Sequence, residues 1–149
     1  TLIETYAAHY LNPNNHNMIL FPEALPCLQR LKQQGYWLAV ATGKGRSGLD
    51  KAIAQTDTQA FWLETACAGE YPSKPAPDMV LALCDRLGVE PEEAVVVGDT
   101  THDLEMAANA KIRAIAVTTG AHTAQQLSSM PHVAMLNSLA ELPDVLETL

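Results

Sequence analysis

The chain has 149 residues, of which 48% are hydrophobic and 17% are charged, and its formal net charge at pH 7 is -8. This length and composition are typical of one globular domain with a substantial core. The acidic balance argues against non-specific binding to nucleic acid or to an anionic membrane, because both need clustered Lys and Arg. We therefore expect no nucleic-acid partner and no membrane partner, and any phosphate handled by the chain to be small.

Three cysteines, Cys27, Cys67 and Cys84, are widely spaced, and each lies in an apolar pattern. An odd number without a CxxC pair favours buried free thiols of a reducing compartment over a disulfide or metal framework. The sequence has no apolar run of about 18 residues and no basic leader before an apolar block. We therefore expect a cytoplasmic protein.

The predicted elements alternate between helices and strands along the chain. After a short amphipathic opening segment, the Asn-rich stretch 11–18 predicts a hinge or linker. Leucines spaced by three between Pro22 and Gly35 predict a helix over 22–35, and a similar pattern predicts another over 77–88. Short apolar runs predict strands at 36–42, 64–69, 93–99, 114–119 and 132–138. Because parallel strands need crossovers, this order predicts an α/β fold with helices on both faces of a parallel sheet.

Polar side chains follow three of the predicted strands. Thr42 follows the first strand, Lys74 follows the weak strand at 64–69, and Asp99 and Asp103 follow the run of valines. In open α/β sheets the ligand lies outside the carboxyl ends of the strands, so these groups can meet in one crevice. Each residue alone has a simpler interpretation, as a helix cap, a solvated lysine or a carboxylate in a first helical turn. Their joint order favours a site.

The segment GKGRSG after the first strand offers an alternative. Gly43, Gly45 and Gly48 satisfy the G-x-G-x-x-G pattern of dinucleotide-binding domains, between a strand and a helix. That pattern also needs an acidic residue about 20 positions further on, at the end of the next strand. Glu64 instead falls at the beginning of the weak run. This alternative also leaves the lysine and the two aspartates without roles.

Three segments resemble, in this order, the second, third and fourth motifs of the haloacid dehalogenase superfamily. They are LAVATGK (38–44), SKPAPDM (73–79) and VVVGDTTHDLEMA (95–107). The resemblance covers about residues 20–149 and is strongest to the phosphoglycolate-phosphatase-like branch. It implies a Rossmann-like, three-layer α/β core with a mostly parallel sheet.

The resemblance also implies a role for each polar residue. Asp99 and Asp103 would hold Mg²⁺, Asp99 directly and Asp103 directly or through water, which suits a hard cation with oxygen ligands. Thr42 would donate its hydroxyl, together with the Gly43 backbone N–H, to a phosphoryl oxygen. Lys74 would neutralise charge on the nucleophile and on the phosphoryl group. A small phosphorylated metabolite is the expected partner.

Three further residues lie close to these motifs. Lys44 and Arg46 are candidates for binding a carboxylate or phosphate of the substrate, with a solvated helix start as the simpler interpretation. We expect His102 to be only an exposed neighbour of the site.

The first motif of the family is missing. In the family, a strand ends in Asp-x-Asp-x-Thr, whose first Asp attacks phosphorus and whose second Asp acts as general acid and base. No two aspartates of this chain are separated by one residue. We therefore expect residues 1–20 to be the end of a helical cap and a hinge, and 21–149 to be the core. The N-terminal strand and most of the cap would be absent from this chain, which alone would be inactive.

The missing strand has a consequence for the sheet. In the family it lies at the centre, between the strands that end at Thr42 and Asp99, so its absence would open a slot between them. The flanking strands would then expose unpaired backbone groups. We expect the slot to be filled by a separate N-terminal fragment, by a second copy through self-association, or by collapse of the two strands onto each other.

These observations together predict the C-terminal core of a Mg²⁺-dependent phosphatase. The complete protein would hydrolyse a small phosphomonoester, such as phosphoglycolate, through an aspartyl-phosphate. Two alternatives remain, a non-catalytic remnant that binds phosphate or a partner, and a dinucleotide-binding domain.

Overall fold

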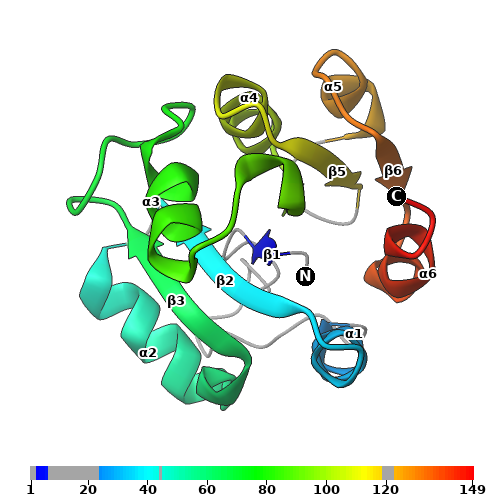
Figure 1. Ribbon diagram of the computed structural model, residues 1–149. Helices are drawn as coiled ribbons and strands as arrows, with labels where there is room; N and C mark the ends of the chain where they lie inside the picture. The colour runs from blue at the N-terminus through cyan, green and yellow to red at the C-terminus, as the bar shows by residue number, and fades with distance from the viewer. Residues whose placement is uncertain (1–2, 7–23, 44, 119–122) are drawn as a thin grey trace.

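The computed structural model describes residues 3–6, 24–43, 45–118 and 123–149. Its strands form one parallel sheet in the order β3-β2-β1-β4-β5-β6 (Figure 1). The strands are β1 (Ile3–Tyr6), β2 (Trp37–Thr42), β3 (Trp62–Cys67), β4 (Ala94–Gly98), β5 (Arg113–Val117) and β6 (Ala134–Leu136). The predicted α/β class is confirmed, and so are the five strands that the apolar runs predicted.

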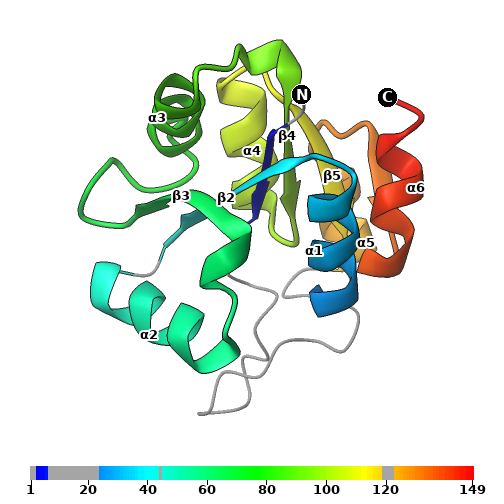
Figure 2. The same ribbon diagram turned by 60° about the horizontal axis from the view of Figure 1, so that its bottom comes forward.

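Helices cover both faces of the sheet (Figures 1 and 2). They are α1 (Ala24–Gln33), α2 (Arg46–Thr56), α3 (Asp78–Leu87), α4 (Thr101–Asn109), α5 (Ala124–Ser128) and α6 (Leu142–Leu146). Single 3₁₀ turns lie at Gln59–Phe61, Pro91–Glu93 and Leu139–Glu141. No helix in the described part of the chain is long and apolar enough to cross a membrane.

The run of valines in β4 shows why the sheet is buried on both faces. Val96 packs with α3 and α4, whereas Val95 and Val97 point to the opposite face, where α1 and α6 pack. Because successive side chains of a strand point to opposite faces, only a continuous apolar run satisfies both layers. α2 covers Val40 of β2 through Leu49.

The slot between β2 and β4 is occupied in this structure. Residues 3–6 form β1 there, with Ile3 paired to Trp37 and Ala94, and Tyr6 paired to Val40 and Val97. Our expectation of an open slot, to be filled by another chain or by collapse, is therefore wrong for this sheet. An empty slot would leave the backbone donors and acceptors of β2 and β4 unpaired. These groups can pair with any extended segment within reach, and residues 3–6 are such a segment.

The occupied slot also changes two related expectations. Residues 3–6 are strand and not the end of a cap, whereas 7–23 lie outside the described residues, so the cap and hinge stay a prediction there. Self-association loses the reason that we gave for it, since the edges of β2 and β4 are paired. The Asp-x-Asp motif is still missing, because the sequence has no aspartate before Asp50.

Candidate active site at the carboxyl end of the sheet

Three predicted site residues lie at the carboxyl ends of the central strands, and all three are buried. Thr42 is the last residue of β2 and Asp99 follows β4, and each is 1% exposed. Asp103 lies in the first turn of α4 and is 0% exposed. Removing a carboxylate from water is costly unless partners stabilise it, so two buried aspartates four residues apart need an explanation.

Lys74 provides the ionic partner of Asp103. Its Nζ lies 2.5 Å from Asp103 Oδ1, and the side chains of the two residues are 7% and 0% exposed. The interpretation of Lys74 as a solvated loop lysine is therefore wrong. The ion pair joins the loop after β3 to the helix after β4, as the joint order of the motifs predicted.

The second oxygen of Asp103 caps its own helix. The backbone N–H and the hydroxyl of Thr100 donate to Asp103 Oδ2 over 3.2 Å and 2.9 Å, and the N–H of Asp103 donates back to Thr100 Oγ1 over 3.2 Å. The N-cap of α4 is thus Thr100, and the interpretation of Asp99 as the cap is wrong. The pattern Thr-x-x-Asp is a capping-box signature that could have identified Thr100 from the sequence.

Asp99 differs from Asp103 in how its carboxylate is held. Its Oδ1 is buried, and no hydrogen-bond donor among the described residues reaches that atom, although the residue makes other interactions. A buried carboxylate oxygen of this kind is chemically suited to a hard cation. Within the described residues there is no cluster of three or more His, Cys, Asp or Glu side chains that could hold a metal, so Asp99 and Asp103 are the available carboxylates.

Gly98 brings the end of β4 against Asp103. A Cβ built on Gly98 would lie 2.3 Å from Asp103 Cβ and 2.8 Å from both Cγ and Oδ2. Side chains do not approach this closely, so only glycine fits at this position. The glycine of the Gly-Asp pair therefore has a packing role that the sequence analysis did not assign.

Comparison with known proteins tests the resemblance of the three motifs. The family described as haloacid dehalogenase-like hydrolase matches residues 1–117 of the chain. The chain belongs to this family. The resemblance of the three motifs is thereby confirmed.

Among the relatives, "Probable phosphatase IndB" of Dickeya dadantii is 36% identical over 126 residues, which cover 83% of this chain and 54% of that protein. A phosphoglycolate phosphatase of Aquifex aeolicus is 35% identical over 106 residues, 69% of this chain and 49% of that protein. A solved haloacid dehalogenase-like hydrolase from Bacteroides fragilis has a TM-score of 0.78 at 31% identity, over 83% of this chain and 59% of its own. The chain thus spans about half the length of the relatives that it matches.

The remaining predicted residues of this haloacid dehalogenase-like core are not buried as the carboxylates are, where the structure describes them. Gly43 and His102 are exposed, and Lys44 lies outside the described residues. Arg46 bonds to Glu70 and Thr65, so its guanidinium is engaged by the protein itself. The interpretation of Arg46 as a solvated helix start is therefore also incomplete.

The dinucleotide-binding alternative finds no support in the geometry. Glu64 is the third residue of β3, where it pairs with Arg86 of α3 at 3.5 Å, so it does not lie at the end of its strand. A ribose-binding carboxylate is expected at the strand end, beside the ligand.

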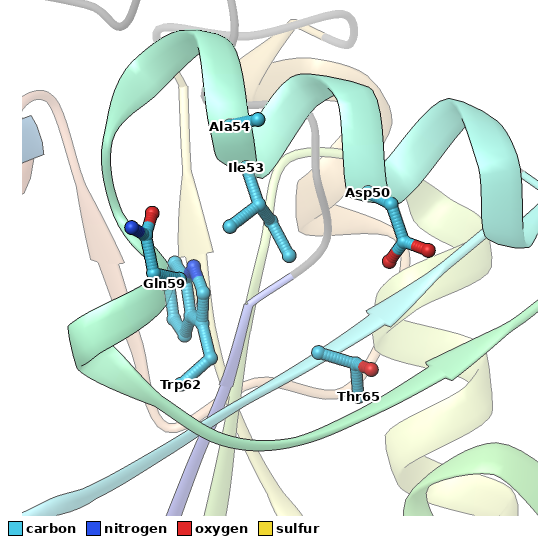
Figure 3. A pocket seen from close by; sticks show the side chains of 6 residues that line it. All are labelled: Asp50, Ile53, Ala54, Gln59, Trp62 and Thr65. Carbon is cyan, nitrogen blue, oxygen red and sulfur yellow. The ribbon is translucent and has the colours of Figure 1, made fainter.

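A pocket of about 400 Å³ lies between α2 and β3 (Figure 3). Its walls are Asp50, Ile53, Ala54, Gln59, Trp62 and Thr65. None of the four buried or ion-paired residues of the candidate site lines it. The pocket is therefore separate from Asp99 and Asp103, and we do not assign the proposed chemistry to it.

The three buried cysteines form no disulfide. They are Cys27, Cys67 and Cys84, and burial raises the pKa of both Cys67 and Cys84. A thiol whose pKa is raised holds little thiolate, so Cys67 and Cys84 are poor nucleophiles. The expectation of buried free thiols is confirmed.

Proposed function

We propose that this chain is the core portion of a Mg²⁺-dependent phosphatase that hydrolyses a small, phosphoglycolate-like phosphomonoester through an aspartyl-phosphate in the complete protein. Phosphatase relatives in the haloacid dehalogenase-like family support the reaction class. The observation on which the proposal mainly rests is the buried Lys74–Asp103 ion pair at the carboxyl end of the sheet. The free buried cysteines support a reducing, cytoplasmic location.

The donor set fits a magnesium ion. Asp99 and Asp103 supply the carboxylate oxygens that a hard cation prefers, and Asp99 would be the direct ligand. When bound, Mg²⁺ neutralises charge on a transferring phosphoryl group. Asp103 already accepts from Lys74 and Thr100, so we assign it to holding the ammonium and the start of α4, with contact to the metal through water.

Two neighbouring loops would bind the phosphoryl group. Thr42 offers a hydroxyl at the end of β2, and Gly43 offers a backbone N–H in the exposed turn that follows. Lys74 offers a positive charge held in a water-poor position by Asp103. Fixed donors and charges of this kind stabilise a phosphoryl-transfer transition state without moving during the reaction.

The described part of the chain offers no residue in the place of the nucleophile. β1 ends at Tyr6, and Glu4 pairs in register with Leu38 and Val95, four residues before Thr42 and Asp99. At about 3.3 Å per strand residue, Glu4 lies roughly 13 Å short of the carboxyl edge. The acyl-phosphate therefore cannot form on β1.

We predict that the 149-residue chain alone does not hydrolyse p-nitrophenyl phosphate with Mg²⁺ faster than buffer. The missing nucleophile is the reason. Release of p-nitrophenol is the measurement, with Asp99→Asn as the matched variant. Turnover that Asp99→Asn abolishes would show that another residue attacks phosphorus, and would contradict the assignment.

Magnesium binding is the direct test of the proposed function. We predict that the chain binds Mg²⁺ with a Kd on the order of 1 mM or weaker, because affinity for hard cations rises with the number of carboxylates. Asp99→Asn should abolish binding, whereas Asp57→Asn, at the exposed end of α2, should leave it unchanged. Calorimetry or NMR titration measures both. Micromolar affinity, or Mg²⁺ binding that Asp99→Asn leaves unchanged, would contradict the proposal.

A non-catalytic, phosphate-binding role is the second candidate. Its basis is that a chain that lacks the nucleophile motif can still bind phosphate at Thr42 and Lys74. Binding of inorganic phosphate to the chain without any turnover fits both candidates. Restored turnover after a segment bearing Asp-x-Asp is supplied would distinguish the phosphatase.

A further inference from the structure

Residues 68–77 form the loop between β3 and α3 (Figure 1). Lys74 of the candidate site lies in this loop and contacts Asp103. Side chains of three helices hold this loop. The contacts are Arg46 of α2 with Glu70, Arg86 of α3 with the Tyr71 hydroxyl at 2.6 Å, Asp103 of α4 with Lys74, and Asn109 of α4 with the Pro75 carbonyl at 3.0 Å. The position of Lys74 therefore depends on groups outside the site.

Arg46 makes the most extensive of these contacts. Its Nε and Nη2 donate to Glu70 Oε2 and Oε1 over 3.0 Å and 2.8 Å, and its Nη1 donates to Thr65 Oγ1 over 2.6 Å. The backbone N–H of Cys67 also donates to Glu70 Oε1 over 3.2 Å. Two parallel bonds from one guanidinium fix the orientation of a carboxylate, which a single ammonium cannot do.

The electrostatics of the pair agree with this geometry. The hydrogen bond from Arg46 is the main reason that the pKa of the Glu70 carboxyl lies below its ordinary value of 4.5. The same bond raises the pKa of Arg46 above its ordinary value. Since the folded-state pKa of Glu70 is lowered, the ion pair is fully formed above about pH 4.5 and is lost as the pH falls through the lowered value.

The positions of Arg46 and Glu70 in the chain show which two segments their contact joins. Arg46 is the first residue of α2, three residues after Gly43, so it belongs to the turn that follows β2. Glu70 belongs to the loop that follows β3 and lies four residues before Lys74. The Arg46–Glu70 pair thus joins the two loops on which the proposed phosphoryl-binding groups lie.

We propose that Arg46 is a positioning residue, which through Glu70 fixes loop 68–77 so that Lys74 stays against Asp103 and at a set distance from Thr42 and Gly43. Its relevance to catalysis rests on the proposed function, but the placement of Lys74 can be tested without it. Arg46 is then not a ligand of the substrate anion, because its three donor nitrogens already bond to Glu70 and Thr65.

The test measures how fast an amine-specific acylating reagent modifies each lysine, with the products quantified by mass spectrometry at one pH. Lys74 is 7% exposed and is expected to react slowly in the unchanged chain. Arg46→Gln, Glu70→Gln and the double variant break the same pair. Arg30→Gln is the matched control, because it breaks an exposed arginine–carboxylate pair with Asp144, 2.7 Å long, on the opposite face of the sheet from α4.

We expect Arg46→Gln and Glu70→Gln each to speed modification of Lys74 at least about threefold, which is within the range measured for partly exposed ion pairs. The double variant should match the single variants, because residues that act as one unit are not additive. Lys111, which is exposed, should keep its rate in every variant, and Arg30→Gln should leave Lys74 unchanged. A general loss of stability would instead speed several lysines together.

Two results would overturn the proposal. One is an unchanged rate at Lys74 in both single variants, and the other is a double variant whose effect is the product of the two single effects. Binding of inorganic phosphate in the presence of Mg²⁺ is measured on the same proteins. If the unchanged chain binds no phosphate, the proposed function fails while the Lys74 rates still decide the role of Arg46.

Discussion

Replacing Lys74 with methionine is expected to lower the free energy of unfolding by about 3–5 kcal/mol, the cost of breaking a buried ion pair from one side. Asp103 would keep its charge at 0% exposure and lose its ionic partner. The two bonds from Thr100 would remain, which places the expected value near the lower end of that range. Urea unfolding followed by circular dichroism measures the change.

Two matched variants make this prediction specific. Lys51→Met, at an exposed position of α2, should change the stability by no more than about 0.5 kcal/mol. Adding Asp103→Asn to Lys74→Met should recover part of the loss, because asparagine is neutral and can still accept from Thr100. The ion pair does not stabilise the fold as described if Lys74→Met lowers the free energy of unfolding no more than Lys51→Met does. The same holds if adding Asp103→Asn to Lys74→Met lowers that free energy further.

The sequence predicted those parts of the fold that local patterns determine. The valines of β4 had to form a strand buried on both faces, and the spacing of Leu28 and Leu31 puts both on the buried face of α1, whereas Leu25 is exposed. β1 was not predicted, because Ile3–Tyr6 has no strong strand pattern and its place depends on the backbone groups that β2 and β4 leave unpaired. Pairing across the chain is not a local property.

In the candidate site, too, some contacts could be predicted from local patterns and others could not. Lys74 and Asp103 were predicted to meet because they follow strands of one parallel sheet, and the ends of such strands meet at one edge. The pairing of Arg46 with Glu70 could not be predicted, since it depends on the path of an irregular loop that brings Glu70 to the first residue of α2. Side chains on loops therefore need the structure, whereas side chains at strand ends can be located from the sequence.

The two proposed metal-binding carboxylates belong to one motif, which forms β4 and the start of α4. Asp99 follows the strand directly, and Asp103 faces back toward Gly98 from the first turn of α4. A strand and a helix that touch this closely fix the backbones of Asp99 and Asp103 relative to each other, whereas the contact of Asp103 with Lys74 is the one that loop 68–77 adds. The metal-binding part of the site should therefore tolerate changes in loop 68–77 better than the phosphoryl-binding part.

Gly98→Ala is expected to disrupt this contact and to destabilise the protein by about 1–3 kcal/mol, the usual cost of forcing an extra carbon into a packed position. The added Cβ would lie 2.3 Å from Asp103 Cβ, which is bonded to the helix backbone and cannot swing aside as the tip of a long side chain can. Either the end of β4 or the first turn of α4 has to move, and Asp103 moves relative to both Lys74 and Asp99. Mg²⁺ binding should weaken beyond detection in the same variant.

Gly43→Ala is the control for the added methyl group itself. Among the described residues nothing lies within 4 Å of a Cβ at Gly43, and the residue is exposed. The free energy of unfolding of Gly43→Ala should therefore change by no more than about 0.5 kcal/mol. Thermal unfolding measures both variants, and NMR shifts of 98–104 and Lys74 locate the disturbance. If Gly98→Ala unfolds at the same temperature as Gly43→Ala and keeps its Mg²⁺ affinity, then the close approach of β4 and α4 does not determine the position of Asp103. If only the stability falls while Mg²⁺ affinity is kept, the carboxylates do not need that approach, because binding at Asp99 would then survive a displaced Asp103.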